Sequence, residues 1–251
     1  MAGPLPPAKR PAVPYSLTAR LYDTIHSWKD YPRESRRVRA LVRQYGPPHA
    51  RTLLDVACGT GNHLRSLSRW YDCTGVDAME GMLRVARRKL PRVRFVRGRM
   101  ETLDLGRKFD AITCLFSAIG YVRGEGALRR TFRRFAEHLA PGGVVIVEPW
   151  LTPGAYRTGD LHRDTFGTPD LPIVRMSLSA RRGHRSILDM HHLAGSARGI
   201  RYWIERHDMG LFEVRTYLDA LRAAGLRPRY VKSGFRKDRG LFLAVLPKAR
   251  S

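Results

Sequence analysis

The stretch TLLDVACGTGNHL, residues 52–64, contains the pattern that decides the fold class. A short apolar run from Thr52 to Ala57 ends in a turn with two glycines, and Leu64, Leu67 and Trp70 then follow at helical spacing. This order of strand, glycine turn and helix is typical of the first unit of a nucleotide-binding α/β fold. We therefore expect a parallel sheet whose first strand lies at residues 52–57.

Strands and helices alternate along the rest of the chain. The further strands expected for the main sheet are 73–77, 93–96, 109–116, 144–148, 229–232 and 240–246. The helices expected between them are 79–90, 125–139 and 213–224. Pro141, Gly142 and Gly143 are expected to end the helix at 125–139 and turn the chain into the next strand. The predicted fold class is α/β, a doubly wound, mostly parallel, seven-stranded Rossmann-like sheet.

Three further segments flank or interrupt this pattern. Residues 1–14 are rich in proline and have no apolar signal-peptide core, so we expect a flexible leader. Two helices near 15–27 and 32–45 precede the sheet, and an insertion at about 151–210 contains three antiparallel strands between Ile173 and Met209. We interpret residues 15–251 as one domain, in which the insertion forms a lid over the functional site and a possible surface for a homodimer.

The charge balance of the chain bears on its partners. The formal net charge is +24, which raises the possibility of a nucleic-acid partner. However, 39 arginines stand against 7 lysines, a skew more typical of codon bias in a GC-rich genome, and no aromatic-rich basic strand suited to base stacking is present. Nucleic acid is therefore an unlikely partner, whereas an anionic small molecule such as a nucleotide diphosphate would be attracted.

Membranes and metals are not expected to take part. No apolar run approaches the roughly 20 residues that span a bilayer, and we predict a cytoplasmic protein. Cys58, Cys73 and Cys114 lack CxxC spacing and are expected to be small buried hydrophobes. His191 and His192 are adjacent, so on a strand they would face opposite sides and share no metal. No bound metal is predicted.

The ligand of the glycine turn is predicted from two further positions. Asp77 ends the second strand, 22 positions after Asp55, where a carboxylate can accept hydrogen bonds from both hydroxyls of a ribose. Leu64 occupies the place of the third glycine of G-x-G-x-x-G, which disfavours close approach of a pyrophosphate. The pair favours an adenosine ligand without a phosphate over NAD.

These motifs resemble those of class I S-adenosylmethionine (SAM) dependent methyltransferases, and more closely the bacterial N,N-dimethyltransferases that act on dTDP-linked aminodeoxysugars in antibiotic biosynthesis. The resemblance extends along nearly the whole chain after the leader. Its landmarks are Leu21-Tyr22-Asp23, Lys29-Asp30-Tyr31, Leu54 to Gly61, His63-Leu64, Phe116 to Tyr121, His138 to Gly143, Glu148-Pro149-Trp150 and Arg239 to Phe242.

The resemblance implies a SAM site in the first half of the chain. Ala57, Gly59 and Gly61 would border the methionine part of SAM, and Asp77 would hold its ribose. The full set of cofactor residues it implies is Tyr22, Tyr31, Ala57, Cys58, Gly59, Gly61, Asp77, Ala78, Met82, Met100 and Leu115.

One position departs from the pattern of the group. The chain has Gly98-Arg99-Met100 where the group usually has Gly-Asp-Met, and arginine offers no acceptor to the adenine amino group. Adenine recognition would then depend on backbone groups near Met100 and apolar walls, or on Glu101. A SAM-binding protein without catalytic activity is favoured only if Arg99 blocks adenine.

The acceptor residues are also implied by the resemblance. Tyr121 and His26 are expected to form an aromatic hydrogen-bonding pair over the acceptor amine, with the histidine and tyrosine of some relatives exchanged. The expected substrate contacts are Glu148, Trp150, Arg175 and Arg239, of which the two arginines would bind a diphosphate. The predicted function is N-methylation of the amino group of a dTDP-linked deoxysugar in natural-product biosynthesis. The alternative is N- or O-methylation of another small natural-product acceptor.

Overall fold

The computed structural model describes residues 15–248, so the predicted leader lies outside the described residues. A seven-stranded sheet forms the centre of the molecule, in the order β10-β11-β5-β4-β1-β2-β3. Its strands are β1 (Thr52–Val56), β2 (Asp72–Asp77), β3 (Arg94–Arg97), β4 (Phe109–Cys114), β5 (Leu139–Val147), β10 (Arg227–Val231) and β11 (Leu241–Val245). The predicted α/β fold class and the return of the last two strands to this sheet are confirmed.

The parallel pairing of the strands places several of their carboxyl ends at one edge of the sheet. Strands β1 to β5 pair parallel to one another, while β11 runs antiparallel to both β5 and β10. The carboxyl ends of β1, β2, β4 and β5 therefore meet at the same edge, where open α/β sheets bind their ligands.

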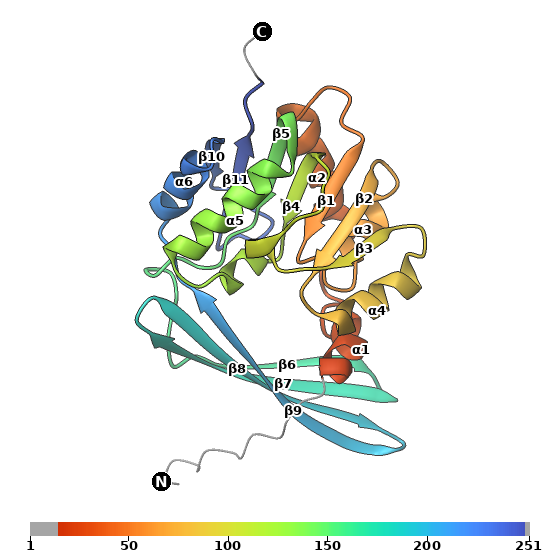
Figure 1. Cartoon of the computed structure of the whole chain (residues 1–251). Helices are drawn as coiled ribbons and strands as arrows, with labels where there is room; N and C mark the ends of the chain where they lie inside the picture. The colour runs from red at the N-terminus through yellow and green to blue at the C-terminus, as the bar shows by residue number, and fades with distance from the viewer. Residues whose placement is uncertain (1–14, 249–251) are drawn as a thin grey trace.

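Helices cover both faces of this sheet (Figure 1). The helical elements are α1 (Tyr15–Ile25), α2 (Tyr31–Tyr45), α3 (Asn62–Leu67), α4 (Glu80–Lys89), η1 (Met100–Thr102), η2 (Ala118–Tyr121), α5 (Glu125–Glu137) and α6 (Val214–Ala223). One apolar core lies between the sheet and α5 with α6, and includes Phe132, Leu221 and the fully buried Phe109. The other lies between the sheet and α2 with α3, around Val38 and Leu64. Two cores on opposite faces are what a doubly wound sheet requires.

The insertion is a four-stranded antiparallel sheet, not the three-stranded one expected. Its strands are β6 (Leu161–Thr168), β7 (Leu171–Arg182), β8 (Arg185–Ser196) and β9 (Gly199–Gly210), in sequential order. The prediction missed β6 because only Asp164 and Phe166 of that strand are even half-buried. An edge strand that buries so little lacks the apolar alternation by which strands are found.

The Pro141-Gly142-Gly143 segment is also placed differently from the prediction. The helix ends earlier, at Glu137, and these three residues lie inside β5. The pairing of β4 with β5 shifts register between Phe109 and Ala111. This irregularity lets the strand accommodate a proline, which has no N–H to donate, and a Gly142 with φ of 80°.

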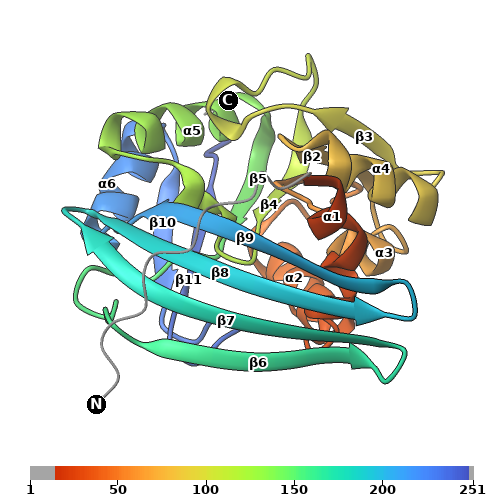
Figure 2. The same ribbon diagram turned by 90° about the horizontal axis from the view of Figure 1, so that it is seen from below.

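The four-stranded sheet lies across the ligand edge of the main sheet (Figures 1 and 2). Helix α1 packs on its inward face, where Leu21 and Ile25 contact Ile173 and Trp203. Trp150, which follows β5, donates a hydrogen bond of 2.8 Å to the Ser186 hydroxyl on β8. The insertion therefore covers the region to which the carboxyl ends of the parallel strands point.

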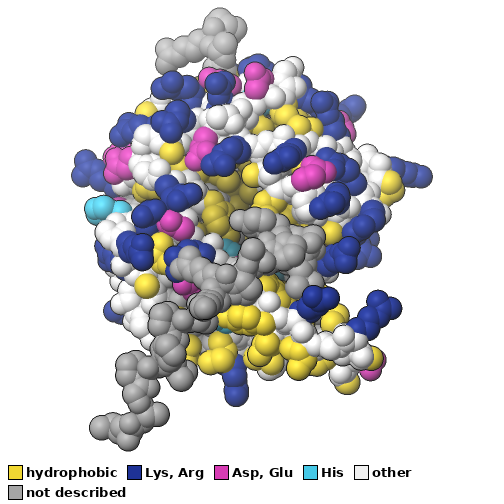
Figure 3. Space-filling view, turned by 60° about the horizontal axis from the view of Figure 1, so that its bottom comes forward, with side chains coloured by type: hydrophobic (Ala, Val, Ile, Leu, Met, Phe, Trp, Pro, Cys, Tyr) yellow, Lys and Arg dark blue, Asp and Glu magenta, His cyan; other side chains and the backbone are white. Residues whose placement is uncertain are grey.

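The outward face of the four-stranded sheet differs from the rest of the surface. Its exposed apolar side chains are Leu161, Met176, Leu178, Leu193 and Ile200. Figure 3 shows hydrophobic side chains gathered towards the bottom of the view, whereas Lys and Arg side chains are scattered and interspersed with acidic ones. Within residues 15–248, no helix is long and apolar enough to cross a membrane.

Candidate active site

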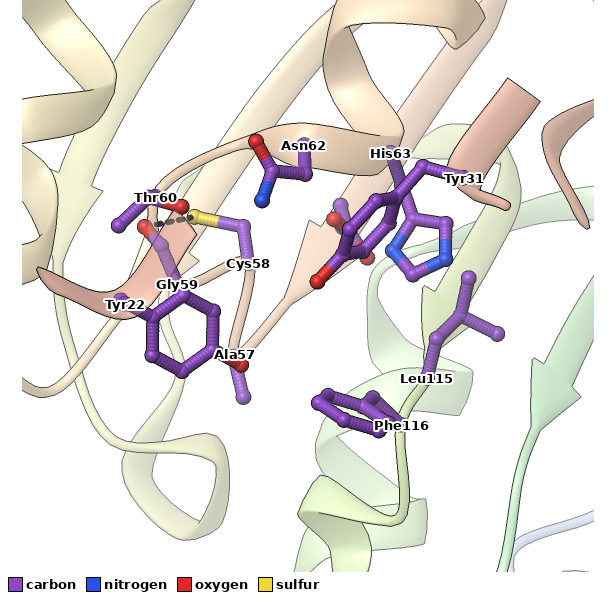
Figure 4. A pocket seen from close by; sticks show the side chains of 11 residues that line it. Tyr22, Tyr31, Ala57, Cys58, Gly59, Thr60, Asn62, His63, Leu115 and Phe116 are labelled. Atoms are coloured by element: carbon purple, nitrogen blue, oxygen red, sulfur yellow. Dashed lines mark hydrogen bonds between the residues drawn. The ribbon is translucent and has the colours of Figure 1, made fainter. Parts of the chain in front are cut away.

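A pocket opens at the carboxyl ends of β1 and β4, beside the glycine turn (Figure 4). Six of the predicted cofactor residues line it: Tyr22, Tyr31, Ala57, Cys58, Gly59 and Leu115. Five lining residues were not predicted: Asp55, Thr60, Asn62, His63 and Phe116. All but Phe116 lie within the stretch 52–64. Their proximity to the glycines is the sequence signal that could have identified them as pocket residues.

Backbone strain is confined to this edge of the sheet. Among the described residues, three that are not glycine have a positive φ: Ala57 at 59°, Phe116 at 52° and Ser117 at 59°. The first follows β1 and the other two follow β4. Such conformations cost free energy and concentrate at functional sites, because the fold must hold them in place. Gly59, at 57°, has no atom within 4 Å of the position that a Cβ would take.

Two carboxylates flank the turn. Asp77 accepts hydrogen bonds from the backbone N–H of Gly59, at 2.9 Å, and of Met79, at 2.8 Å. Asp55 is almost fully buried and accepts a hydrogen bond of 2.7 Å from the Thr113 hydroxyl. Burial raises the pKa of both groups, that of Asp55 to about 6. Asp77 thus fixes the glycine turn at the position where the sequence predicts a ribose.

Five predicted cofactor residues do not line the pocket, namely Asp77, which bonds to the Gly59 amide of its wall, and the four that follow. The missing side chain of Gly61, at φ of 78°, allows close approach of Leu90, whose methyl group lies 3.2 Å from a Cβ placed there. Met82 is buried in α4, Met100 packs against the core, and Ala78 is exposed beside Asp77. Gly61 is therefore placed to bring α4 against the turn.

A polar cluster fastens α1 to the glycine turn. The Asp23 carboxylate accepts hydrogen bonds from the Thr60 hydroxyl at 2.6 Å, the Asn62 amide at 2.9 Å and the Lys89 ammonium at 2.7 Å. The pKa of Asp23 is lowered although burial opposes this, since these donors stabilise its charged form. The cluster holds the neighbouring Tyr22 over the pocket.

A second cluster fixes the other tyrosine. Lys29 is buried and pairs with Glu34, whose second oxygen lies 2.8 Å from Nε2 of His63. Asp30 accepts a hydrogen bond of 2.9 Å from the backbone N–H of Arg33 and caps α2. Tyr31 begins that helix, and its buried hydroxyl points into the pocket with no hydrogen-bond partner among the described residues.

The predicted hydrogen-bonding pair of Tyr121 and His26 is not present. The Tyr121 hydroxyl instead lies 2.6 Å from Nδ1 of His207, on β9. His26 packs against the rings of Tyr22, at 4.4 Å between centroids, and Phe116, at 5.1 Å. Burial, with a contribution from Arg175, lowers the pKa of His26 to about 4. The insertion supplies the partner of Tyr121, because η2 packs against β9.

Three of the predicted substrate residues meet beside the pocket. Glu148 is fully buried; one oxygen accepts a hydrogen bond of 2.6 Å from the Phe116 N–H, and the other has no partner among residues 15–248. Burial raises the pKa of its carboxyl group. Arg239 donates a hydrogen bond of 2.7 Å to the Ser117 hydroxyl and stacks on Trp150 with 4.8 Å between guanidinium and ring centroid.

A second pocket, more aromatic, opens on the far side of Arg239. Its lining includes Trp150, Tyr217, Tyr230, Asp238 and Arg239. The Arg239 side chain is 7% exposed and forms an ion pair of 2.7 Å with Asp238. The guanidinium thus lines this aromatic pocket and bonds to Ser117, which is adjacent in the chain to Phe116 of the first pocket.

Arg175 and Arg99 are engaged elsewhere. Arg175 lies on β7, in an ion pair of 2.8 Å with Asp164 and over the ring of Phe166. It lines neither pocket, because the insertion strand that carries it turns it towards β6. Arg99 is exposed and pairs with Glu101 at 3.3 Å, so it points away from the core that holds Met100.

The remaining cysteine and histidine predictions have mixed outcomes. Cys73 and Cys114 are buried, but Cys58 is half-buried at the pocket wall. His192 is 1% exposed and stacks on Trp203, while His191 bonds to Tyr202 on the other face, as predicted for adjacent strand residues. No group of three His, Cys, Asp or Glu in the described part of the chain is placed to hold a metal ion.

Comparison with known proteins agrees with this geometry. Residues 53–143 match the family model described as a methyltransferase domain. The chain is 41% identical over 236 residues to the dTDP-3-amino-3,6-dideoxy-alpha-D-glucopyranose N,N-dimethyltransferase of Streptomyces fradiae, covering 92% of this chain and 91% of that protein.

Two solved structures are similar over nearly the whole chain. DesVI from Streptomyces venezuelae superposes with a TM-score of 0.86 at 36% identity, covering 95% of this chain and 100% of the other. An amino pentose methyltransferase from Micromonospora echinaspora, solved with SAM bound, gives a TM-score of 0.81 at 33% identity, with the same coverage. The chain belongs to the SAM-dependent methyltransferases, in the family that includes the dTDP-aminodeoxysugar N,N-dimethyltransferases.

Proposed function

We propose that this enzyme methylates the amino group of a dTDP-linked deoxysugar. The observation that supports it best is the position of Arg239. Its buried guanidinium lines an aromatic pocket with Trp150 and bonds to Ser117, the residue next to Phe116 of the glycine-turn pocket. A planar, permanently charged group in that position suits a diphosphate, whose sugar would extend towards the first pocket and whose base would extend towards the second.

SAM, which supplies the methyl group when bound, suits the residues of the first pocket. SAM carries positive charge at its sulfonium and its ammonium. The Asp55 carboxylate lines this pocket, and the Asp77 carboxylate bonds to the Gly59 amide of its wall. Gly59 leaves open space beside its amide, and the Tyr31 hydroxyl points inwards without a partner. We propose that Tyr22 and Tyr31 cover the cofactor and that Asp77 holds its ribose.

Position accounts for most of the proposed catalysis. Methyl transfer requires the acceptor lone pair, the methyl carbon and the sulfur in line, and holding reactants in that geometry supplies much of the rate. Glu148, with its unpartnered buried oxygen, and Trp150 leave β5 beside the strained loop and are proposed to contact the sugar. Tyr121 and His26 are proposed to orient the amine from η2 and α1.

A substrate panel tests this function. Purified enzyme and SAM are incubated with dTDP-3-amino and dTDP-4-amino deoxysugars, free aminosugars and small natural-product amines and phenols, and methylated products are identified by mass spectrometry. Transfer to a dTDP-linked aminosugar, with little to the free sugar, is the expected result. Transfer to another amine or to a hydroxyl, with every nucleotide sugar ignored, would instead support the alternative acceptor class.

Three wider predictions go with this proposal. The four-stranded sheet is proposed to act as the acceptor lid of a single domain, since it covers the ligand edge. Its apolar outward face, with Leu178 and Ile200 exposed, is proposed as the surface of a homodimer, which light scattering would measure. A cytoplasmic location also stays a prediction.

A further inference from the structure

We propose that His207, held by Glu205, receives the proton that the acceptor amine releases, with Tyr121 as the bridge. This inference rests on the proposed amine methylation. Under it His207 is a positioning and proton-accepting residue that acts through Tyr121, which itself faces the acceptor. Neither His207 nor Glu205 belongs to the glycine-turn wall; both come from the inward face of the insertion.

The three groups lie in a row, joined by one short hydrogen bond and one longer ion-pair contact. The Tyr121 hydroxyl lies 2.6 Å from Nδ1 of His207, and Nε2 of His207 lies 3.5 Å from Oε2 of Glu205. The other oxygen of Glu205 accepts hydrogen bonds from the Thr18 hydroxyl at 2.6 Å and from the Trp203 indole N–H at 3.0 Å. Glu205 is thus anchored by α1 and by its own strand.

The negative charge of Glu205 determines which ring nitrogen of His207 carries the hydrogen. The hydrogen bonds that it accepts lower the pKa of Glu205 to about 2 against the opposing effect of burial, so it is ionised at neutral pH. A carboxylate beside Nε2 favours the tautomer with the hydrogen on Nε2, which leaves the Nδ1 lone pair for the Tyr121 hydroxyl. The same carboxylate would stabilise the imidazolium once Nδ1 is protonated.

Tyr121 can carry a proton in this arrangement without being ionised first. Burial, with contributions from Glu205 and Asp77, raises the pKa of Tyr121, so a free tyrosinate is not the base. The hydroxyl oxygen accepts a proton from the substrate ammonium while its own hydrogen passes to Nδ1 of His207. One N–H bond breaks at the substrate and one forms at His207, and the Tyr121 hydroxyl is regenerated.

This route answers a requirement of amine methylation. The substrate amine is mostly an ammonium at neutral pH and has no free lone pair in that form. Each transfer also yields a cationic amine, which has to lose a proton before it can accept another methyl group. Tyr121 is 48% accessible as a residue although its hydroxyl group is buried against His207, so it can connect the acceptor side with a base set back from it.

The other titratable groups near His207 are poorly suited to this role. His26 of α1 and His192 of β8 both face it, and burial lowers the pKa of each to about 4, so they stay neutral and are weak bases. Arg175 of β7 is a fixed cation paired with Asp164. Of the histidines on this face, His207 is the one that adjoins both Tyr121 and a carboxylate.

Kinetics of variants test the proposal. His207→Phe removes the acceptor nitrogen and keeps a ring, and His207→Gln keeps a hydrogen bond without a titratable group. Both are expected to lower kcat by about 100-fold at pH 7 with little change in KM, the scale of general acid–base assistance. Tyr121→Phe should cost a similar factor, and the double variant no more than either single one, because the two act as one unit.

The chain contains a matched control. His191 also lies against a tyrosine hydroxyl through Nδ1, at 2.7 Å from Tyr202, but on the outward face of the same sheet. His191→Phe should leave kcat unchanged. Without the relay the rate should follow the free-amine fraction, so the defect of His207→Phe should shrink by up to about tenfold per pH unit between pH 7 and 9. A defect that is equal at all pH values would mean a structural role only and would overturn the relay.

A second measurement needs no substrate. Ring ¹⁵N NMR of the folded protein should show His207 with its hydrogen on Nε2, and Tyr121→Phe should shift the Nδ1 signal. The tautomer with the hydrogen on Nδ1 would overturn the relay even if the enzyme proved to act on another acceptor. Conversely, inactivity of the wild type towards every aminosugar, with the NMR result as expected, would refute the proposed function and leave the geometry intact.

Discussion

The two walls of the active site are built in opposite ways. The cofactor wall comes from one continuous stretch, residues 52–64, together with Asp77 at the next strand end, and its geometry follows from a sharp turn between β1 and α3. The acceptor wall is assembled from η2, the segment after β5, β9 and the loop before β11, so that Tyr121 meets His207 and Ser117 meets Arg239. A local motif fixes the first wall, and tertiary packing fixes the second.

This difference predicts that the walls can be damaged separately. Residues of the cofactor wall should alter SAM binding with little effect on the acceptor, and residues of the acceptor wall should do the reverse. A variant that impairs both equally would show that the division is wrong. The following changes are ordered from the largest expected effect to the smallest.

Arg239→Ala should produce the largest effect, on the acceptor. Losing a buried guanidinium that binds a diphosphate costs about 2–3 kcal/mol, or roughly a 30- to 150-fold higher KM for the dTDP-aminosugar. Turnover should change less, because a phosphate contact is similar in the ground and transition states. Initial-rate kinetics measure the KM, and calorimetry should find the SAM affinity unchanged.

The contact of Arg239 with Ser117 complicates this variant, because that hydroxyl belongs to the strained loop. Arg239→Lys is the control: it keeps the charge and loses the planar fork, so its KM should lie between those of the wild type and Arg239→Ala. An unchanged KM in both variants would exclude the diphosphate anchor.

Asp77→Ala should weaken SAM binding by about tenfold or more, the scale of a lost hydrogen bond to a charged group. The carboxylate also holds the Gly59 amide, so its removal loosens the turn as well. Asp72→Ala is a matched control at the opposite, exposed end of β2, where the carboxylate pairs only with Arg107, at 3.2 Å. Calorimetry that finds equal SAM affinity in the two variants would remove Asp77 from the site.

The four-stranded sheet, which supplies β9 to the acceptor wall, should also be sensitive to acid through His192 of β8. Burial lowers the pKa of His192 from 6.5 to about 4. The unfolded chain therefore binds a proton at this histidine more readily than the folded protein does. The contribution of neutral His192 to the free energy of unfolding is complete above pH 6.5 and is lost as the pH falls towards 4. At pH 5 the loss should be roughly 1–2 kcal/mol, since each unit of pKa difference corresponds to about 1.4 kcal/mol.

Denaturant unfolding at pH 7 and pH 5 measures this loss. His192→Phe keeps the stack on Trp203 and should reduce the fall in unfolding free energy by that amount. The carboxyl group of Asp55, whose pKa is raised to about 6, opposes the trend but cancels between wild type and variant. An identical fall in His192→Phe would contradict the assigned protonation.

The same contrast explains how much could be predicted from the sequence. The seven strands of the main sheet and the helices between them follow from apolar periodicity and glycine turns, which are local. Strand β6 could not be found because it buries so few side chains. Pro141 to Gly143 resemble a helix stop, but their place in β5 depends on a register shift against β4, which lies about 30 residues earlier.

The candidate site shows the same limit. Tyr22, Tyr31, Ala57, Cys58 and Gly59 line the pocket as the motif and the resemblance predicted. His207 carried no signal, because its pairing with Tyr121 spans 86 positions and requires the lid to lie across η2. A histidine on an alternating strand cannot be assigned to an inward or functional role until its partner is known.

Arg99→Asp should have the smallest effect. It tests whether the residue at position 99 contributes to SAM binding at the cofactor wall. Arg99 is exposed and pairs with Glu101, so its removal costs little stability, as is usual for surface ion pairs. An aspartate there would offer the adenine amino group an acceptor. One added hydrogen bond of about 0.5–1 kcal/mol would tighten SAM binding by roughly two- to fivefold. Arg97→Asp, at the end of β3 and two residues before Arg99, controls for the change in charge. Calorimetry that finds the same gain in both variants would show a general electrostatic effect, and weaker binding in Arg99→Asp alone would show that Arg99 itself assists the cofactor.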